Sequence, residues 1–140
     1  MDRDLAVTLG AVFQPTAFPG VVSAYVFGSH AAGRTHRESD IDIGVLLDRN
    51  IYPTRQARFE VRVRLLSDLG HALRTAAVDL VVLNDAPPHL VRRVMVDGLR
   101  IVCADPETDH AARRIASSRA ADLEPFLRRA RAIKLQAIGR

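Results

Sequence analysis

Two apolar segments joined through a Gly-Ser pair and an Asp-x-Asp motif constrain this chain more than any other feature. The first segment, residues 21–27, is rich in β-branched and aromatic residues and ends at Gly28. This composition predicts a buried β-strand. Ten residues separate Ser29 from the second segment, which begins with Asp40 and Asp42 and continues as an apolar run. Because side chains two apart on a strand share a face, both carboxylates are expected to point the same way.

This arrangement predicts a site for phosphate and a divalent cation. A glycine lets the backbone approach a ligand closely, and the first N–H groups of a helix bind anions, so Gly28 and Ser29 are expected to open a turn or short helix that receives phosphate. Two adjacent carboxylates repel each other without a cation, and Mg²⁺ takes one or two carboxylates with phosphate and water. The alternative is a helix-capping Ser29 and two exposed strand carboxylates.

A Gly-Ser pair, ten residues and Asp-x-Asp resemble the signature of the nucleotidyltransferase superfamily, which includes DNA polymerase β and the aminoglycoside nucleotidyltransferases. Gly28, Ser29, Asp40 and Asp42 match it at this spacing. The resemblance implies an α/β (α+β) chain with the nucleotidyltransferase fold. In that fold a small mixed β-sheet is packed with helices, and we expect a long C-terminal helix here.

A third carboxylate, Asp79, lies in the short β-forming run 77–84. An acid inside such a run is costly unless it is paired or bound to metal. Superfamily members carry a third carboxylate on the strand beside the Asp-x-Asp strand, and Asp79 resembles it. The resemblance implies that Asp79 helps to hold the metal and takes the proton from the attacking hydroxyl. The alternative is an edge-strand acid that faces water.

Later segments are similar to the MntA-like adenylyltransferase antitoxins of HEPN/MNT toxin–antitoxin systems. These segments are Val-Asp-Leu-Val-Val-Leu-Asn at 78–84, Pro-Pro-x-Leu at 87–90 and Asp-Gly at 97–98. The resemblance covers residues 20 to about 104 well and the last helix only loosely. It implies that the chain transfers AMP from ATP to a tyrosine of a cognate HEPN-domain toxin, an RNase whose activity is thereby blocked.

The same resemblance implies two Mg²⁺ ions held by Asp40, Asp42 and Asp79, with ATP as substrate and a hetero-oligomer with the toxin. Two other functions stay open. A small-molecule nucleotidyltransferase usually carries a second helical domain, for which 140 residues leave little room. An antitoxin that acts by binding alone would not need an intact carboxylate trio.

The loop between the two motifs departs from the family pattern. Relatives often have Arg directly after Gly-Ser and again two residues later, where this chain has His30 and Ala32. Arg34 and Arg37 lie near enough to contact a triphosphate instead, and Arg34 is the candidate for nucleotide binding. His30 and His36 are expected to be peripheral, because two-metal transfer needs no histidine.

The rest of the chain predicts helices and strands in alternation. A helix is expected over 5–13, a strand over 99–104, and a short helix over 87–97 capped by Gly98. A long helix should start at Asp105 and be kinked or broken by Pro125. Its apolar side is formed by Ile115, Leu123, Leu127, Ala130 and Ile133.

The segment after residue 55 predicts an amphipathic helix of about five turns. Its apolar stripe is formed by Phe59, Val63, Leu66, Leu69 and Leu73. Its arginines are expected to be mostly exposed, and these are Arg55, Arg58, Arg62, Arg64 and Arg74.

Length and composition predict a single domain over residues 1–140, with a catalytic core at about 20–104 and a helical segment at 105–140. The single cysteine, Cys103, lies in an apolar run, so we expect inert core, no internal disulfide and a cytoplasmic protein. No apolar run approaches a membrane span, and the charged N-terminus does not resemble a signal peptide. Residues 105–140 hold 8 basic and 5 acidic residues but few aromatics, so direct nucleic-acid binding is not expected.

Overall fold

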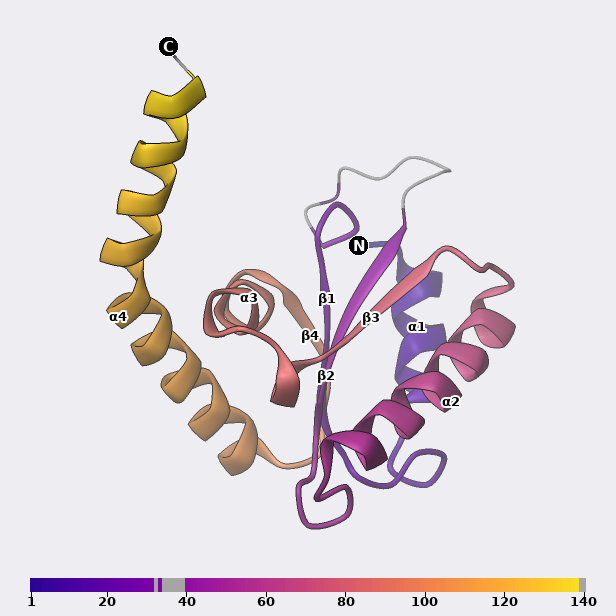
Figure 1. Ribbon diagram of the computed structural model, residues 1–140. Coiled ribbons are helices and arrows are strands. Elements are labelled where there is room, and N and C mark those ends of the chain that lie inside the picture. Colours follow the sequence, from indigo (N-terminus) through magenta and orange to yellow (C-terminus); the bar gives the residue numbers. More distant parts are fainter. Residues whose placement is uncertain (32, 34–39, 139–140) are drawn as a thin grey trace.

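A four-stranded mixed sheet organises the molecule (Figure 1). The computed structural model describes residues 1–31, 33 and 40–138. Strand β1 (Val21–Phe27) is antiparallel to β2 (Ile41–Leu47) and to β4 (Leu99–Cys103), while β2 is parallel to β3 (Val78–Val82). The strand order is β3-β2-β1-β4, so β3 and β4 form the edges. The predicted small mixed sheet with helices and a long C-terminal helix is confirmed.

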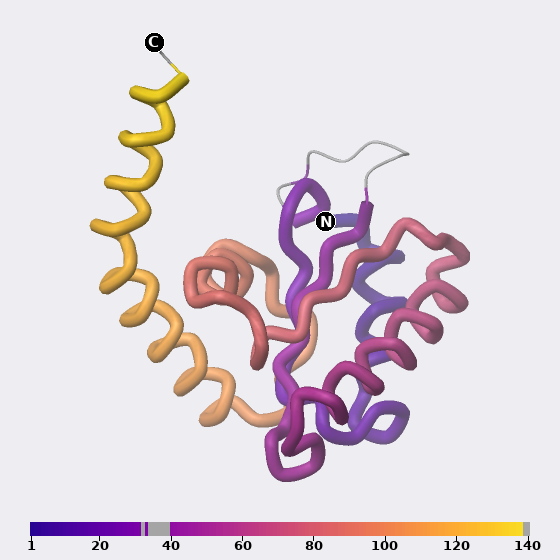
Figure 2. The backbone as a smooth tube through the Cα atoms, viewed as in Figure 1, coloured from indigo at the N-terminus to yellow at the C-terminus, as the bar shows by residue number. Residues whose placement is uncertain are grey.

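Helices cover both faces of this sheet (Figures 1 and 2). On one face lie α1 (Arg3–Val12) and α2 (Arg55–Leu73), and on the other lie α3 (Pro88–Arg92) and α4 (Pro106–Ile138). Successive residues of β1 point to opposite faces, so Val26 joins the core under α1 and α2, whereas Tyr25 joins the core under α3 and α4. Both side chains are almost fully buried.

The predicted apolar stripe of α2 is wrong in part. Phe59 and Val63 are 54% and 49% exposed, and the buried residues of the helix are Arg58, Val61, Leu65 and Leu69. Arg58, expected at the surface, is 5% exposed because its guanidinium donates to both carboxylate oxygens of Asp85, at 3.0 and 2.9 Å, and to the Tyr52 carbonyl at 3.0 Å. A bidentate ion pair with a third hydrogen bond makes burial of a guanidinium tolerable.

The segment between β3 and β4 also differs from the expected single helix. A 3₁₀ turn, η1 (Leu83–Asp85), precedes α3, and a π-helix, η2 (Arg93–Asp97), follows it. Gly98 is not a left-handed cap, since its φ is −78°. A Cβ at this position would collide with the carbonyl oxygens of Val94 and Val26, so glycine is needed for close backbone approach.

A buried polar cluster fastens the start of α4 to the sheet. The Tyr25 hydroxyl donates to Asp109 Oδ1 at 2.6 Å, and Arg100 Nη1 donates to Asp109 Oδ2 at 3.1 Å. Asp109 is 1% exposed, and burial together with this carboxylate raises the pKa of Tyr25 well above its ordinary value. Cys103 is half-buried at an edge strand, not fully in the core.

Helix α4 is continuous across Pro125, so the proline does not break it. Figure 1 shows instead that the helix curves, with its concave side toward the sheet, and that its second half leaves the body of the molecule. Asp105 accepts hydrogen bonds from the N–H and the hydroxyl of Thr108, which confirms the predicted helix start. No helix within the described ranges is both long and apolar enough to cross a membrane.

Candidate active site

The turn that follows β1 lies directly against a carboxylate of β2. Phe27, the last residue of β1, pairs with Asp42 in the antiparallel ladder. Gly28 then has a φ of +73°, and a Cβ built on it would collide with Asp42 Oδ2. Glycine is therefore required twice, for its left-handed backbone and for the space that the carboxylate occupies. The Gly-Ser turn and the Asp-x-Asp strand are adjacent, as their spacing predicts.

The three predicted carboxylates come from two neighbouring strands. Asp40 precedes β2 and is exposed, Asp42 is half-buried, and Asp79 is opposite Asp42 in the parallel β2–β3 register. Burial raises the pKa of Asp42, and the charges of Asp79 and then Asp40 raise it further. The charges of His30 and Arg93 act in the opposite direction and lower that pKa. The pKa of Asp42 thus depends on the charges of four neighbouring side chains.

Asp79 is not a costly buried acid; its position is the one named as the alternative, on an edge strand and facing water. Asp79 is exposed, and β3 is an edge strand, so water solvates this carboxylate without help from a metal. Its place in the register, opposite Asp42, is the feature that connects it to the site. The catalytic and metal-binding roles of Asp40, Asp42 and Asp79 stay predictions.

The chemistry of these carboxylates fits Mg²⁺. In the part of the chain that the structure describes, no three His, Cys, Asp or Glu side chains converge as a complete ligand set. Mg²⁺ does not need such a set, because it binds one or two carboxylates and keeps water or phosphate oxygens in its other positions. A half-buried carboxylate that feels two like charges is a suitable anchor for a small cation.

The structure describes only some of the residues predicted to bind phosphate. Ser29 is half-buried in a turn, and the Gly33 N–H donates to the His30 carbonyl at 3.4 Å to close that turn. The described residues after Gly28 form turns and not the short helix that was the other expectation. Arg34, the predicted nucleotide contact, lies outside the described residues, as do the neighbouring candidates Arg37 and His36.

Arg93 is a site residue that sequence reasoning missed. It is the first residue of η2, and the next residue, Val94, packs against Gly44, where a Cβ would come within 2.7 Å of Val94 Cγ1. Gly44 and Asp42 are two apart on β2 and share a face, so η2 covers the face that carries the carboxylates. Single-turn π segments occur frequently at functional sites. No motif marked Arg93, and only the Pro-Pro-x-Leu segment before it hinted at its position.

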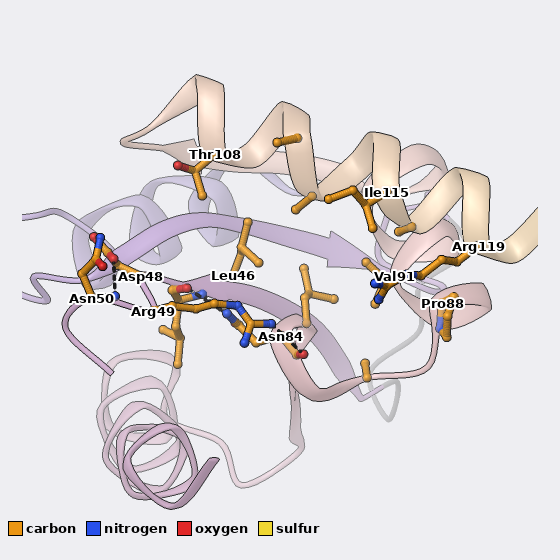
Figure 3. Close-up of a pocket in the computed structure, with 16 residues that line it drawn as sticks. Leu46, Asp48, Arg49, Asn50, Asn84, Pro88, Val91, Thr108, Ile115 and Arg119 are labelled. Carbon is orange, nitrogen blue, oxygen red and sulfur yellow. Dashed lines mark hydrogen bonds between the residues drawn. The ribbon is translucent and has the colours of Figure 1, made fainter. Parts of the chain in front are cut away.

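A cavity of about 410 Å³ lies at the other end of β2, away from Asp42 (Figure 3). Leu46 and Asn84 approach it from the sheet side and Ile115 and Arg119 from α4. The Asn84 amide bonds to both backbone groups of Leu47, at 2.8 and 2.9 Å. None of the predicted site residues lines this cavity, so it is separate from the carboxylate site.

Known proteins resemble this chain in both sequence and fold. Protein adenylyltransferase MntA of Shewanella oneidensis is 36% identical over 83 residues, which are 59% of this chain and 55% of that protein. The match therefore spans about half the length of this curated relative.

Solved structures show the same fold at lower identity. A chain in the crystal structure of a toxin–antitoxin with AMP-PNP aligns with a TM-score of 0.66 and 24% identity, over 99% of this chain and 100% of that one. A chain in the structure of a tri-AMPylated Shewanella oneidensis HEPN toxin in complex with MNT antitoxin aligns with a TM-score of 0.64 and 22% identity, over the whole of both chains.

The sequence model of the family "Polymerase beta, Nucleotidyltransferase" matches residues 11–107. This range includes the Gly-Ser turn, all three carboxylates and Arg93. The chain therefore belongs to the polymerase β nucleotidyltransferase family.

Proposed function

We propose that the chain is a magnesium-dependent adenylyltransferase that moves AMP from ATP to a tyrosine hydroxyl of a HEPN-family RNase toxin and so neutralises it. The observation that carries the proposal is the contact between Gly28 and the Asp42 carboxylate. It brings a backbone turn suited to phosphate within contact distance of a carboxylate suited to Mg²⁺. The likeness to MntA supports adenylyl transfer as the reaction, and the toxin complexes among the structural neighbours support a protein acceptor.

The reaction is a displacement at the α-phosphorus of ATP. The acceptor oxygen forms a bond to this phosphorus, the bond to the bridging oxygen breaks, and pyrophosphate leaves. Asp40, Asp42 and Asp79 would hold Mg²⁺, which when bound offsets the negative charge that develops on the transferred group. Asp79 is the base proposed to take the acceptor proton, because it is exposed at the sheet edge and open to a protein hydroxyl.

The remaining residues position the nucleotide. The Ser29 hydroxyl and the N–H groups after Gly28 are proposed to donate to the terminal phosphates. Arg93, whose charge acts on Asp42, supplies a cation on the same face, where the triphosphate would lie. It compensates for the absence of arginine at positions 30 and 32, the role first expected of Arg34.

Intact-mass measurement of the partner tests this function. A cognate HEPN protein incubated with the chain, ATP and Mg²⁺ is expected to gain mass in whole AMP units, and EDTA should prevent the gain. The Asp40→Asn/Asp42→Asn double variant is the control, because it keeps side-chain shape and removes the charge that anchors Mg²⁺.

Three results would contradict the proposal in different ways. Full neutralisation of the toxin by the double variant, with no mass change, would make the chain an antitoxin that acts by binding. Modification of an aminoglycoside and of no protein would make it a small-molecule nucleotidyltransferase. Unchanged transfer in EDTA would remove the metal from the mechanism.

A further inference from the structure

The second half of α4 carries apolar side chains that nothing in the described part of the chain covers. Ala120 is the last buried residue of this helix, although the helix continues to Ile138. Beyond it Leu123, Phe126 and Ile133 are 39%, 62% and 67% exposed. The projecting segment is about 27 Å long at the α-helical rise of 1.5 Å per residue. Most helical stability in proteins comes from tertiary packing of an apolar face, so a partner surface is expected for this segment.

Leu123, Phe126 and Ile133 belong to one continuous strip. The members of this strip recur along α4 at alternating steps of four and three, the spacing that keeps side chains on one seam of a helix. This inner strip of α4 consists of Ala112, Ala116, Arg119, Leu123, Phe126, Ala130, Ile133 and Ala137. Its first three members line the 410 Å³ cavity (Figure 3). The cavity and the projecting arm are therefore parts of the same surface.

The curvature of α4 makes this strip concave. Pro125 lies on the side of the helix opposite the strip, and its ring crowds the carbonyl of Ala121, four residues earlier. That crowding opens the helix on the proline side and bends it toward the strip. Figure 1 shows the matching curve, with the concave side toward the sheet. The arm extends toward the end of the sheet where β1 ends and β2 begins.

Cations flank or interrupt the strip. Arg129 packs over the Phe126 ring at 5.0 Å, Lys134 borders the strip on its other side, and Arg119 lies at the cavity. None of these three has an ion-pair partner among the described residues. Arg128 and Arg131, by contrast, are already paired with Glu124, at 3.3 and 3.0 Å. Among the described residues of α4 beyond Ala120, Asp122 is the only acid that borders the strip.

We propose that the inner strip of α4 is a docking surface for an amphipathic helix of a partner protein, whose apolar seam is flanked by Glu and Asp. Charge selects this occupant. A second copy of the chain would bring Arg129 and Lys134 against the same cations, and like charges at flanking positions oppose helix pairing. A nucleic acid would neutralise the cations but leave Leu123, Phe126 and Ile133 in water. An acidic helix covers both kinds of side chain.

The inference extends the proposed function, because it names the surface that holds a protein acceptor on the α3 and α4 side of the sheet. It is tested by binding without ATP, so that its outcome is independent of catalysis. The full chain is titrated into a labelled synthetic peptide of four heptads with Leu at the two seam positions and Glu at the flanking positions. A matched peptide carries Lys at those flanking positions.

The wild-type chain is expected to bind the Glu peptide, more weakly as salt is added, and not the Lys peptide. Phe126→Asp and Ile133→Asp should each weaken binding by about tenfold or more. Leu135→Asp is the control, because Leu135 is as exposed as Ile133, at 69%, but lies on a different side of the helix. The Arg129→Glu/Lys134→Glu double variant should reverse the preference toward the Lys peptide. Circular dichroism and thermal melting check that every variant is folded.

Four results would overturn the proposal. The first is equal affinity for the Glu and Lys peptides, and the second is a Leu135→Asp variant that weakens binding as much as Phe126→Asp does. The third is a dimer of the chain alone that Phe126→Asp dissociates. The fourth is binding of a single-stranded RNA oligonucleotide in place of the Glu peptide. If the wild-type chain binds the Glu peptide but transfers no AMP to a HEPN protein, the proposed function is contradicted and the docking surface is not.

Discussion

Replacing Asp79 by Asn should stabilise the metal-free chain while it abolishes transfer. Asp79 lies opposite Asp42 on adjacent parallel strands, which are about 4.8 Å apart. Two unit charges about 5 Å apart in water repel by about 0.8 kcal/mol, and the dielectric constant of water applies because Asp79 is exposed. For a chain of this length, removal of that repulsion is expected to raise the melting temperature by about 3 °C.

The pH dependence has a definite sign. Burial and the charges of Asp79 and Asp40 raise the pKa of Asp42 in the folded state, so the folded chain binds a proton more readily than the unfolded chain. The contribution of Asp42 to the free energy of unfolding therefore increases as pH falls through the raised pKa toward the ordinary one, and decreases as pH rises. In Asp79→Asn this dependence should be shallower, since one cause of the raised pKa is gone.

Scanning calorimetry in EDTA, at neutral pH and low salt, measures the difference. Asp68→Asn is the matched control, because Asp68 is an exposed acid on α2, on the other face of the sheet. The gain should shrink at high salt, and Mg²⁺ with ATP should raise the melting temperature of the wild type more than that of the variant. A drop of several degrees in Asp79→Asn would mean that this carboxylate stabilises the fold. Wild-type transfer by the variant would show that Asp79 is not the base.

Three further substitutions separate binding, positioning and stability. Ser29→Ala should weaken ATP binding in calorimetry and leave the melting temperature unchanged, because it removes a hydrogen-bond donor to phosphate but no side-chain volume from the core. An unchanged affinity for ATP would mean that the turn is purely structural. Arg93→Ala should raise KM for ATP more than it lowers kcat, whereas Arg92→Ala, its exposed neighbour, should change neither, and equal effects would contradict a specific role. Arg58→Ala should lower the free energy of unfolding by about 3 kcal/mol in urea titration, because it leaves Asp85 unpaired, and a change below about 0.5 kcal/mol would refute that estimate.

The adjacency of the Gly-Ser turn and the Asp-x-Asp strand could be predicted because it depends on residues close together in the sequence. The apolar run 21–27 and the segment starting at Asp40 predict two strands, and both are observed. An antiparallel pair joined by a loop brings together the residues that flank the loop, whatever path the loop takes. Gly28 therefore contacts Asp42 even though residues 32 and 34–39 of the chain between them are not described.

Residues whose surroundings depend on distant segments could not be placed. The buried face of α2 was missed because Arg58 finds its partner, Asp85, 27 residues later in the chain. The exposure of Asp79, expected only as the alternative, follows from the edge position of β3, and the sequence of one strand does not specify the order of strands in the sheet. Arg93 reaches the site because Gly44 admits Val94 against the sheet, which is a packing detail with no sequence signature.

The same two strands carry both the core and the site, and this explains how the charges are held in place. Val26 and Ile43 pair across β1 and β2 and are fully buried, and their neighbours in the ladder are Phe27 and Asp42. Asp42 lies one residue beyond this fully packed pair, so its backbone has little freedom to move away from Asp79. The repulsion between the two carboxylates is therefore not relaxed by a shift of the strands. The proposed binding of a cation would then need no rearrangement of the backbone. The core would thereby keep the carboxylates in position for that ligand, at a cost of about 1 kcal/mol in its absence.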